Sequence, residues 1–198
     1  MYLGCQYSLY PMTSDFVAVI LDAVKPLQRY KDRLDIETDD VSTTLIGGAH
    51  VLFPALLESF SAAARVPGHL VMNLSLSRGC PGEPDDPRCA LPARPDPASE
   101  TKVALAGPRR SPIGIAASAQ IALYPLGRPE YMDDIVACIG AAKSAGTFAK
   151  GKHFCTKLAG DVADVFDTIE RSFLDFSPGN SHVVLTAIVS KGSPTQAR

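Results

Sequence analysis

The sequence lacks the patterns that mark membrane-spanning, secreted and nucleic-acid-binding proteins. A membrane helix needs an apolar run of about 18 residues or more, and none is present. The N-terminus has neither the basic flank nor the apolar segment of a secretory signal. No run of Lys and Arg exceeds Arg109-Arg110, and the 198 residues carry a net charge of −2, so we expect no nucleic-acid partner. Together these absences predict a cytoplasmic protein.

The sequence also lacks the spacings that are typical of metal and nucleotide sites. The five cysteines form no CxxC pair and the four histidines form no HxxxH pair, so we expect no bound metal. Neither GxxxxGK[ST] nor GxGxxG occurs, so Gly47-Gly48 is interpreted as a turn and no cofactor is expected. A disulfide between Cys80 and Cys89 is disfavoured, because the cytosol keeps thiols reduced.

What the sequence does contain is an internal repeat. Residues 8–12 (SLYPM) recur as residues 122–126 (ALYPL), a shift of 114 positions. At a shift of 113, eleven residues between Thr43 and Pro81 meet identical residues in the second half. Such self-similarity indicates a tandem duplication of one structural unit.

A proline-rich segment separates the two copies. Residues 79–112 hold eight prolines and little apolar periodicity, a composition typical of an extended linker. We therefore expect a first domain over residues 1–82, a linker over 83–112 and a second domain over 113–198.

Each copy has the pattern of a β-α-β-β-α-β unit. The first is expected to contain a strand over 4–10, a helix capped by Ser14, a hairpin of strands 33–38 and 41–47, a helix with Leu52, Phe53, Leu56, Leu57 and Phe60 on one face, and a strand over 69–78. The second is expected to contain a strand over 115–124, a helix with Pro129 at its first position, a hairpin through 147–159, a helix over 161–176 and a strand over 182–190. This order predicts an α+β protein made of two ferredoxin-like domains in tandem.

The alternation of side chains divides each sheet into two faces. Gln6, Ser8 and Tyr10 alternate with apolar residues, as do Asn73 and Ser75, so they should share the face that the helices leave open. We expect this face to be covered by another sheet, within the chain or across a dimer, around a polar cavity.

The predicted hairpin tip of the first copy, residues 37–44, carries three carboxylates and four hydroxyls. Carboxylates at Glu37, Asp39 and Asp40 could accept hydrogen bonds from the amine of an aminopyrimidine. The alternative is that Asp39-Asp40 is only a turn, which aspartate favours.

The segments GCQYSLYPM, ETDDVST and HLVMNLSLSRGCPG resemble, in that order, the first-repeat motifs of the YkoF family. The resemblance implies a homodimer that binds thiamin or its hydroxymethylpyrimidine moiety without catalysis, in salvage or uptake, with a functional link to a vitamin-uptake transporter. It implies a ligand site formed by Gln6, Ser8, Tyr10, Glu37, Thr38, Asp39, Asp40, Ser42, Thr43, Asn73 and Ser75.

The second copy departs from this pattern at the hairpin tip. Positions equivalent to Glu37, Asp39 and Asp40 hold Lys150, Lys152 and His153. An acid-dependent pocket for a cation could not survive this exchange unchanged, because like charge near the thiazolium ring of thiamin is unfavourable. We therefore expect the second site to be weaker, empty or suited to another ligand, such as one with a phosphate. Its candidate residues are Gln120, Tyr124, His153, Cys155 and Thr186.

Two other function classes stay open at this point. One is an enzyme on a ferredoxin-like barrel, with Asp39, Asp40 or His153 as acid or base. The other is an ACT-like sensor whose dimer interface responds to ligand. His69 and His182, at equivalent strand starts, are interpreted as structural hydrogen-bonding residues.

Overall fold

The computed structural model describes residues 3–80, 109–127, 129–176 and 182–197. Most of the predicted linker, including Cys89, lies outside these residues. The domain limits and the question of a Cys80–Cys89 disulfide therefore remain predictions.

Both halves have the element order that the sequence predicts. The first contains β1 (Leu3–Pro11), α1 (Phe16–Val24), the 3₁₀ turn η1 (Lys25–Arg29), β2 (Leu34–Thr38), β3 (Thr43–Gly47), α2 (Ala49–Ala64) and β4 (Leu70–Arg78). The second contains β5 (Ala116–Pro125), α3 (Tyr131–Ser144), β6 (Phe148–Gly151), β7 (Thr156–Asp161), α4 (Val162–Leu174), β8 (Val183–Lys191) and the 3₁₀ turn η3 (Pro194–Ala197).

Two predicted helix starts are wrong. The N-cap of α1 is Asp15 and not Ser14, because the Thr13 hydroxyl accepts the Asp15 N–H at 3.2 Å and forms a turn before the helix. The N-cap of α3 is Glu130, which leaves Pro129 before the helix instead of at its first position.

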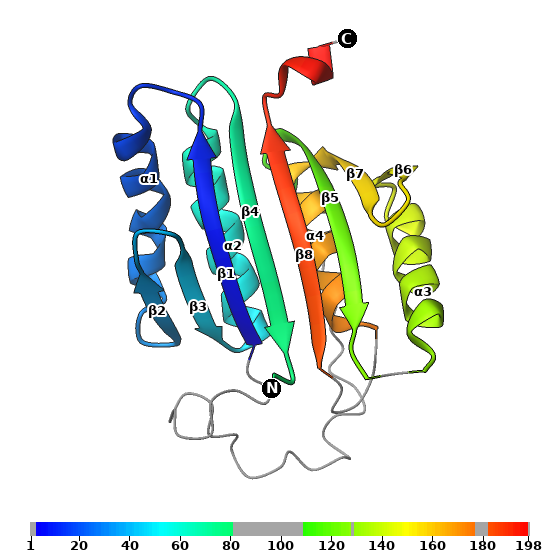
Figure 1. The fold of residues 1–198 in the computed structure, drawn as a ribbon. Coiled ribbons are helices and arrows are strands. Elements are labelled where there is room, and N and C mark those ends of the chain that lie inside the picture. The colour runs from blue at the N-terminus through cyan, green and yellow to red at the C-terminus, as the bar shows by residue number, and fades with distance from the viewer. Residues whose placement is uncertain (1–2, 81–108, 128, 177–181, 198) are drawn as a thin grey trace.

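One antiparallel sheet of eight strands joins the two halves. Its order is β2-β3-β1-β4-β8-β5-β7-β6, so β4 and β8 pair at the centre. The four α-helices of the described residues cover one face of this sheet, and the other face stays open along its whole width (Figure 1). The open surfaces of the two halves thus lie side by side. The option that they pack against each other within the chain is wrong, because hydrogen bonding between β4 and β8 holds them on the same side.

The core lies between the sheet and the helices. The predicted apolar face of α2 and the equivalent face of α4 are buried. Two aromatic pairs join these two helices. Phe60 and Phe166 lie with their ring centroids 5.5 Å apart, and Phe53 and Phe173 lie 6.4 Å apart. Through these contacts the helices of the first half pack directly against those of the second half.

The junction of the halves has an approximate twofold symmetry. Leu74 of β4 lies opposite Ala187 of β8, its equivalent at a shift of 113. His69 Nε2 lies 3.0 Å from Ser190 Oγ, and His182 Nε2 lies 3.1 Å from Ser77 Oγ. The same histidine–serine hydrogen bond therefore forms twice across the junction. The structural interpretation of both histidines is confirmed.

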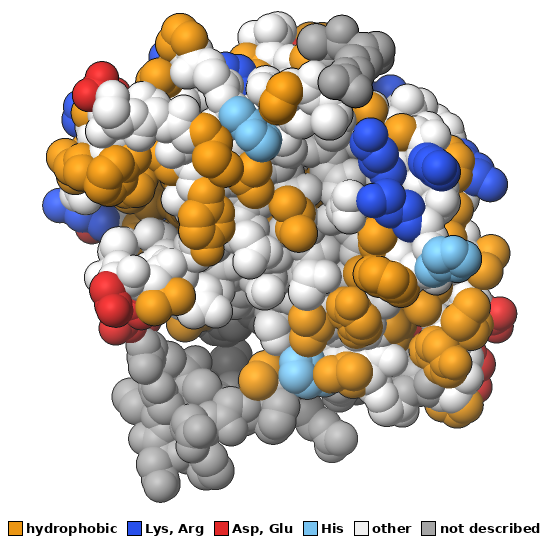
Figure 2. Space-filling view, turned by 45° about the horizontal axis from the view of Figure 1, so that its top comes forward, with side chains coloured by type: hydrophobic (Ala, Val, Ile, Leu, Met, Phe, Trp, Pro, Cys, Tyr) orange, Lys and Arg blue, Asp and Glu red, His pale blue; other side chains and the backbone are white. Residues whose placement is uncertain are grey.

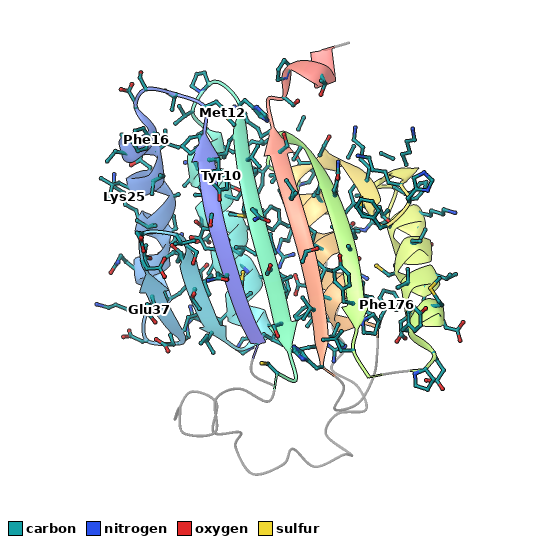
Figure 3. All side chains as sticks on the ribbon, in the orientation of Figure 1. Tyr10, Met12, Phe16, Lys25, Glu37 and Phe176 are labelled. Carbon is teal, nitrogen blue, oxygen red and sulfur yellow. The ribbon has the colours of Figure 1, made fainter. Side chains whose placement is uncertain are left out.

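Two equivalent cations repeat this symmetry at the ends of the central strands. Arg78 is buried and donates hydrogen bonds to the carbonyls of Phe173, at 3.2 Å, and Phe176, beyond the C-terminus of α4 (labelled in Figure 3). Lys191 donates from Nζ to the carbonyls of Val66, at 2.8 Å, and Gly68, at 3.2 Å, which follow α2. Each half thus neutralises the carbonyl-rich helix end of the other half.

Candidate functional site

Polar side chains of four strands form a row on the open face of the first half. The register places Thr44 between Glu37 and Gln6, and places Gln6 opposite Ser75. Beyond Ser75 the row continues to Thr186 in β8. Directly opposite residues of an antiparallel pair have Cβ atoms about 4.5–5.5 Å apart, so these five side chains are immediate neighbours.

The next row adds an amide and two hydroxyls. Ser8 lies opposite Asn73, and the Ser8 hydroxyl donates to the Val41 carbonyl at 2.7 Å. The Gln6 amide donates to Ser42 Oγ at 2.9 Å. These bonds attach the hairpin between β2 and β3 to the open face of β1, and they fix the orientation of the Gln6 amide.

Tyr10 and Glu37 lie toward different parts of this face. Tyr10 lies near the end of β1, while Glu37 lies on the edge strand β2 (Figure 3). The Tyr10 side chain is 51% exposed and lies opposite Val71. An aromatic ring at one end and a carboxylate at the other make the surface amphipathic.

The structure gives Asp39 a turn-forming role. Its Oδ1 accepts the N–H groups of Ser42 and Val41, both at 2.8 Å. These backbone donors, from Ser42 and then Val41, lower the pKa of the Asp39 carboxyl. The carboxylate is thus used within its own loop, and Asp40 lies exposed beside it.

Two residues expected at the site lie on the opposite face of the sheet. Thr43 pairs with Tyr7, which faces the helices, and the Thr43 hydroxyl lies 3.0 Å from that of Thr38. Thr44 takes their place on the open face. The strand register could have identified Thr44, because it is one residue out of step with the buried Thr43.

The second half repeats the arrangement with different chemistry. Cys155 Sγ lies 3.6 Å from Gln120 Oε1, where the first half has Ser42 and Gln6. Gln120 lies opposite Lys157, and Lys157 lies opposite Lys150. The two halves therefore present opposite charge at equivalent positions.

The remaining candidates of the second half are dispersed. His153 lies at the hairpin tip beside the cationic strands, and Tyr124 lies at the far end of β5. Thr186 lies opposite Ser75 on one side and Ala122 on the other, so it continues the polar row of the first half. The repeat alone could not show this contact, because Thr186 meets Ser75 only through the pairing of β4 with β8 at the junction of the two halves.

Neither a metal cluster nor a membrane helix is found in the described part of the chain. No group of three or more His, Cys, Asp or Glu side chains there could hold a metal ion. Among the described helices, none combines the length and apolar character needed to cross a membrane.

Comparison with known proteins finds matches along both halves. The model of the YKOF-related family matches residues 2–83 and 116–196. A protein of Bacillus subtilis (strain 168), named "Putative HMP/thiamine-binding protein YkoF", is 34% identical over an alignment of 198 residues. The alignment covers 98% of this chain and 92% of that protein. The two ranges matched by the family model leave out most of the proline-rich segment.

Proposed function

Because the chain belongs to the YKOF-related family, we propose that it binds thiamin or its hydroxymethylpyrimidine moiety, without catalysis, on the open face of the first half. The name of the Bacillus subtilis relative supports a thiamin-related ligand. The observation that carries the proposal is the polar row Glu37, Thr44, Gln6 and Ser75, with Asn73 in the adjacent row.

The chemistry of this row matches an aminopyrimidine. The amides of Gln6 and Asn73 each offer donors and an acceptor, which suit ring nitrogens and an exocyclic amine. The Glu37 carboxylate adds a negative charge that favours a cationic ligand. Tyr10 offers an aromatic face on which a flat or cationic ring can stack. Three kinds of contact thus come together on one surface.

A second copy of the chain would complete the site. The open face also carries apolar and aromatic side chains, among them Tyr10, Tyr124 and Ile188, which are 51%, 46% and 49% exposed. Covering such a face removes apolar area from water, so we propose a homodimer in which two open faces enclose the ligand. The strand order 2-3-1-4 in each half supports a classification as two ferredoxin-like units.

The cellular setting is proposed from the family alone. A binding protein of this kind would act in thiamin-precursor salvage or uptake in the cytoplasm, with a functional link to a vitamin-uptake transporter. The use of Asp39 within its own turn argues against an enzyme that takes this carboxylate as its base.

Titration calorimetry with thiamin and hydroxymethylpyrimidine tests the proposal. Asn73→Ala and Gln6→Ala should each weaken binding by about 1–3 kcal/mol, because a buried hydrogen-bond partner of the ligand is lost. Gln120→Ala is the matched control, since it removes the equivalent amide of the second half and should leave the affinity unchanged. Equal loss in Gln6→Ala and Gln120→Ala would contradict the placement of the site. No loss in Gln6→Ala and Asn73→Ala would contradict it too.

A further inference from the structure

We propose that the β6–β7 hairpin of the second half is a separate anion site that takes a phosphate monoester carried on an aromatic ring. The site goes beyond the proposed function and does not depend on it. It uses residues of the second half that are equivalent to acidic or neutral residues of the first.

A cavity of about 480 Å³ lies at this hairpin. Its lining includes Gln120, Lys150, Lys152, His153 and Phe154. A basic side chain thus comes from β6 and another from the hairpin turn, beside an imidazole, an amide and an aromatic ring. The volume is sufficient for a small phosphorylated ring compound.

The two strands bring like charges together. Lys150 and Lys157 are directly opposite each other in the β6–β7 pair. Like charges at such a position destabilise a sheet, and neither lysine forms an ion pair with a carboxylate within the described residues. The equivalent residues of the first half, Glu37 and Thr44, carry no such repulsion. Lys150 lines the cavity, whereas Lys157 is its neighbour on β7, so an anion bound beside Lys150 would reduce this repulsion.

The turn of the hairpin adds backbone donors. Lys152 N–H donates to the Cys155 carbonyl at 2.8 Å, as Asp39 N–H donates to the Ser42 carbonyl at 3.0 Å in the first half. The two turns therefore have the same closing bond. In the first half the Asp39 carboxylate accepts two N–H groups of its turn.

The second half has no carboxylate at this place. Lys152 replaces Asp39, and the N–H groups of Phe154 and Cys155, equivalent to those that Asp39 accepts, donate to no acceptor that the described residues provide. Successive backbone N–H groups in a turn are a recurrent anion-binding element. The same turn thus binds an internal carboxylate in one half and offers its amides to an external anion in the other.

Phe154 indicates what carries the anion. Its side chain is 85% exposed at the wall of the cavity, although a benzyl group gains free energy when it leaves water. A planar ring attached to the phosphate could stack on it. Figure 2 shows a group of Lys and Arg side chains on the side of the molecule that carries the second half, which would attract such an anion.

Calorimetry with phenyl phosphate, inorganic phosphate and phenol tests the site. We expect phenyl phosphate to bind more tightly than inorganic phosphate, and phenol not to bind. The double variant Lys150→Ala/Lys157→Ala should weaken the binding of phenyl phosphate by about tenfold or more, because a charge-assisted contact of the cavity wall and the charge of its cross-strand neighbour are lost. Phe154→Ala should reduce the affinity for phenyl phosphate to that for inorganic phosphate. Lys31→Ala, which removes an exposed lysine of the first half, is the matched control and should change neither.

Two further measurements keep the proposal falsifiable. Without ligand, the melting temperature of Lys150→Ala/Lys157→Ala should not fall, because a repulsion is removed; weaker binding by a folded variant then reports on the site. Asn73→Ala should leave phenyl phosphate binding unchanged, which separates this site from the pyrimidine site. Unaltered binding in the double lysine variant would overturn the proposal. Tighter binding of a single-stranded oligonucleotide than of phenyl phosphate would also overturn it, in favour of a surface for a polyanion.

Discussion

The Asp161 carboxylate connects three segments of the second half. It accepts the N–H of Ala163, at 2.9 Å, in the first turn of α4, and those of Ile113 and Gly114, at 3.0 and 2.7 Å, before β5. Burial by itself would raise the pKa of this carboxyl, but the backbone donors outweigh it and lower the pKa. A single side chain thus caps a helix and anchors the start of a strand.

Replacing this cap should weaken the fold in a pH-dependent manner. Asp161→Ala should lower the free energy of unfolding by about 0.5–2 kcal/mol at pH 7, as for other N-cap residues. Because the folded pKa is below the unfolded value, the contribution of the charged carboxylate is present above the unfolded pKa. It is lost as the pH falls through the folded pKa. Urea unfolding at pH 7 and at about pH 3 should therefore show a smaller difference between the variant and the wild type at the lower pH.

The control for this experiment is Asp35→Ala, which removes an exposed carboxylate of β2 that makes no hydrogen bond in the described structure. It should change the stability little at either pH. A difference between Asp161→Ala and the wild type that is the same at both pH values would contradict the role of the charged form.

The face of the sheet on which a candidate residue lies was predictable where it depends only on the alternation of side chains along a strand. Gln6, Ser8 and Asn73 lie on the open face as that alternation predicts. The hairpin residues were not predictable in the same way. The alternation restarts after the turn, so whether Thr43 or Thr44 lies on the open face depends on where β3 begins, and that depends on hydrogen bonds within the turn.

At the scale of elements, the fold depends on how α2 packs against α4. The Phe60–Phe166 pair joins the C-terminal part of α2 to the N-terminal part of α4, and both side chains are fully buried. At a shift of 113, Phe60 is equivalent to Phe173 and Phe53 to Phe166, so the Phe60–Phe166 and Phe53–Phe173 pairs are two copies of one contact, related by the approximate twofold axis.

Truncation of this pair should be costly and not additive. Phe60→Ala and Phe166→Ala should each lower the free energy of unfolding by about 3–5 kcal/mol, because each leaves a cavity in a packed core. The double variant should lose less than the sum, since the second truncation removes a contact that is already absent. Phe16→Ala, at a ring that is 51% exposed on α1, is the control and should have a small effect in the same urea titration. Strict additivity would show that the two rings do not interact.

The elements themselves were predictable because each has a clear period. Strand and helix limits differ from those predicted by two residues or fewer, and the starts of α1 and α3 are among those that differ. Those two starts depend on turns at Thr13 and Glu130 that the pattern of apolar residues does not encode.

At the scale of the whole molecule, Arg78 and Lys191 connect the halves. They are equivalent in the repeat, yet Arg78 is buried and Lys191 is partly exposed. The guanidinium also lies 5.8 Å from the centre of the Phe173 ring, so it is packed as well as hydrogen-bonded. The contribution of the two cations to stability should therefore differ, although their geometry is related.

Arg78→Met should lower the free energy of unfolding by about 1–3 kcal/mol, because it leaves carbonyls at the end of α4 without a partner. Lys191→Met should cost less, since water can replace the partially exposed ammonium group. Arg29→Met tests the loss of an exposed cation, whose side chain is 66% exposed, and should have little effect. Guanidinium-induced unfolding measures all three. A larger loss in Lys191→Met than in Arg78→Met would contradict this account.

How the halves are joined could not be predicted from the repeat alone. A duplicated unit with an open sheet face can pair face to face or edge to edge, and in both arrangements each half packs its helices on the same face of its own sheet. The edge pairing is decided by β4 and β8, whose side chains facing the helices form one continuous apolar surface, and by the reciprocal His69–Ser190 and His182–Ser77 bonds. The two histidines were recognisable in the sequence, but their partners in the opposite half were not.

The approximate twofold axis between β4 and β8 has a consequence for how the protein can change over generations. In a dimer of identical chains, one codon specifies both symmetric positions, so every substitution occurs twice. Here the symmetric positions 37 and 150 have separate codons, one for Glu and one for Lys. Joining the copies in one polypeptide lets each hairpin acquire its own charge while the shared junction keeps its symmetric bonds.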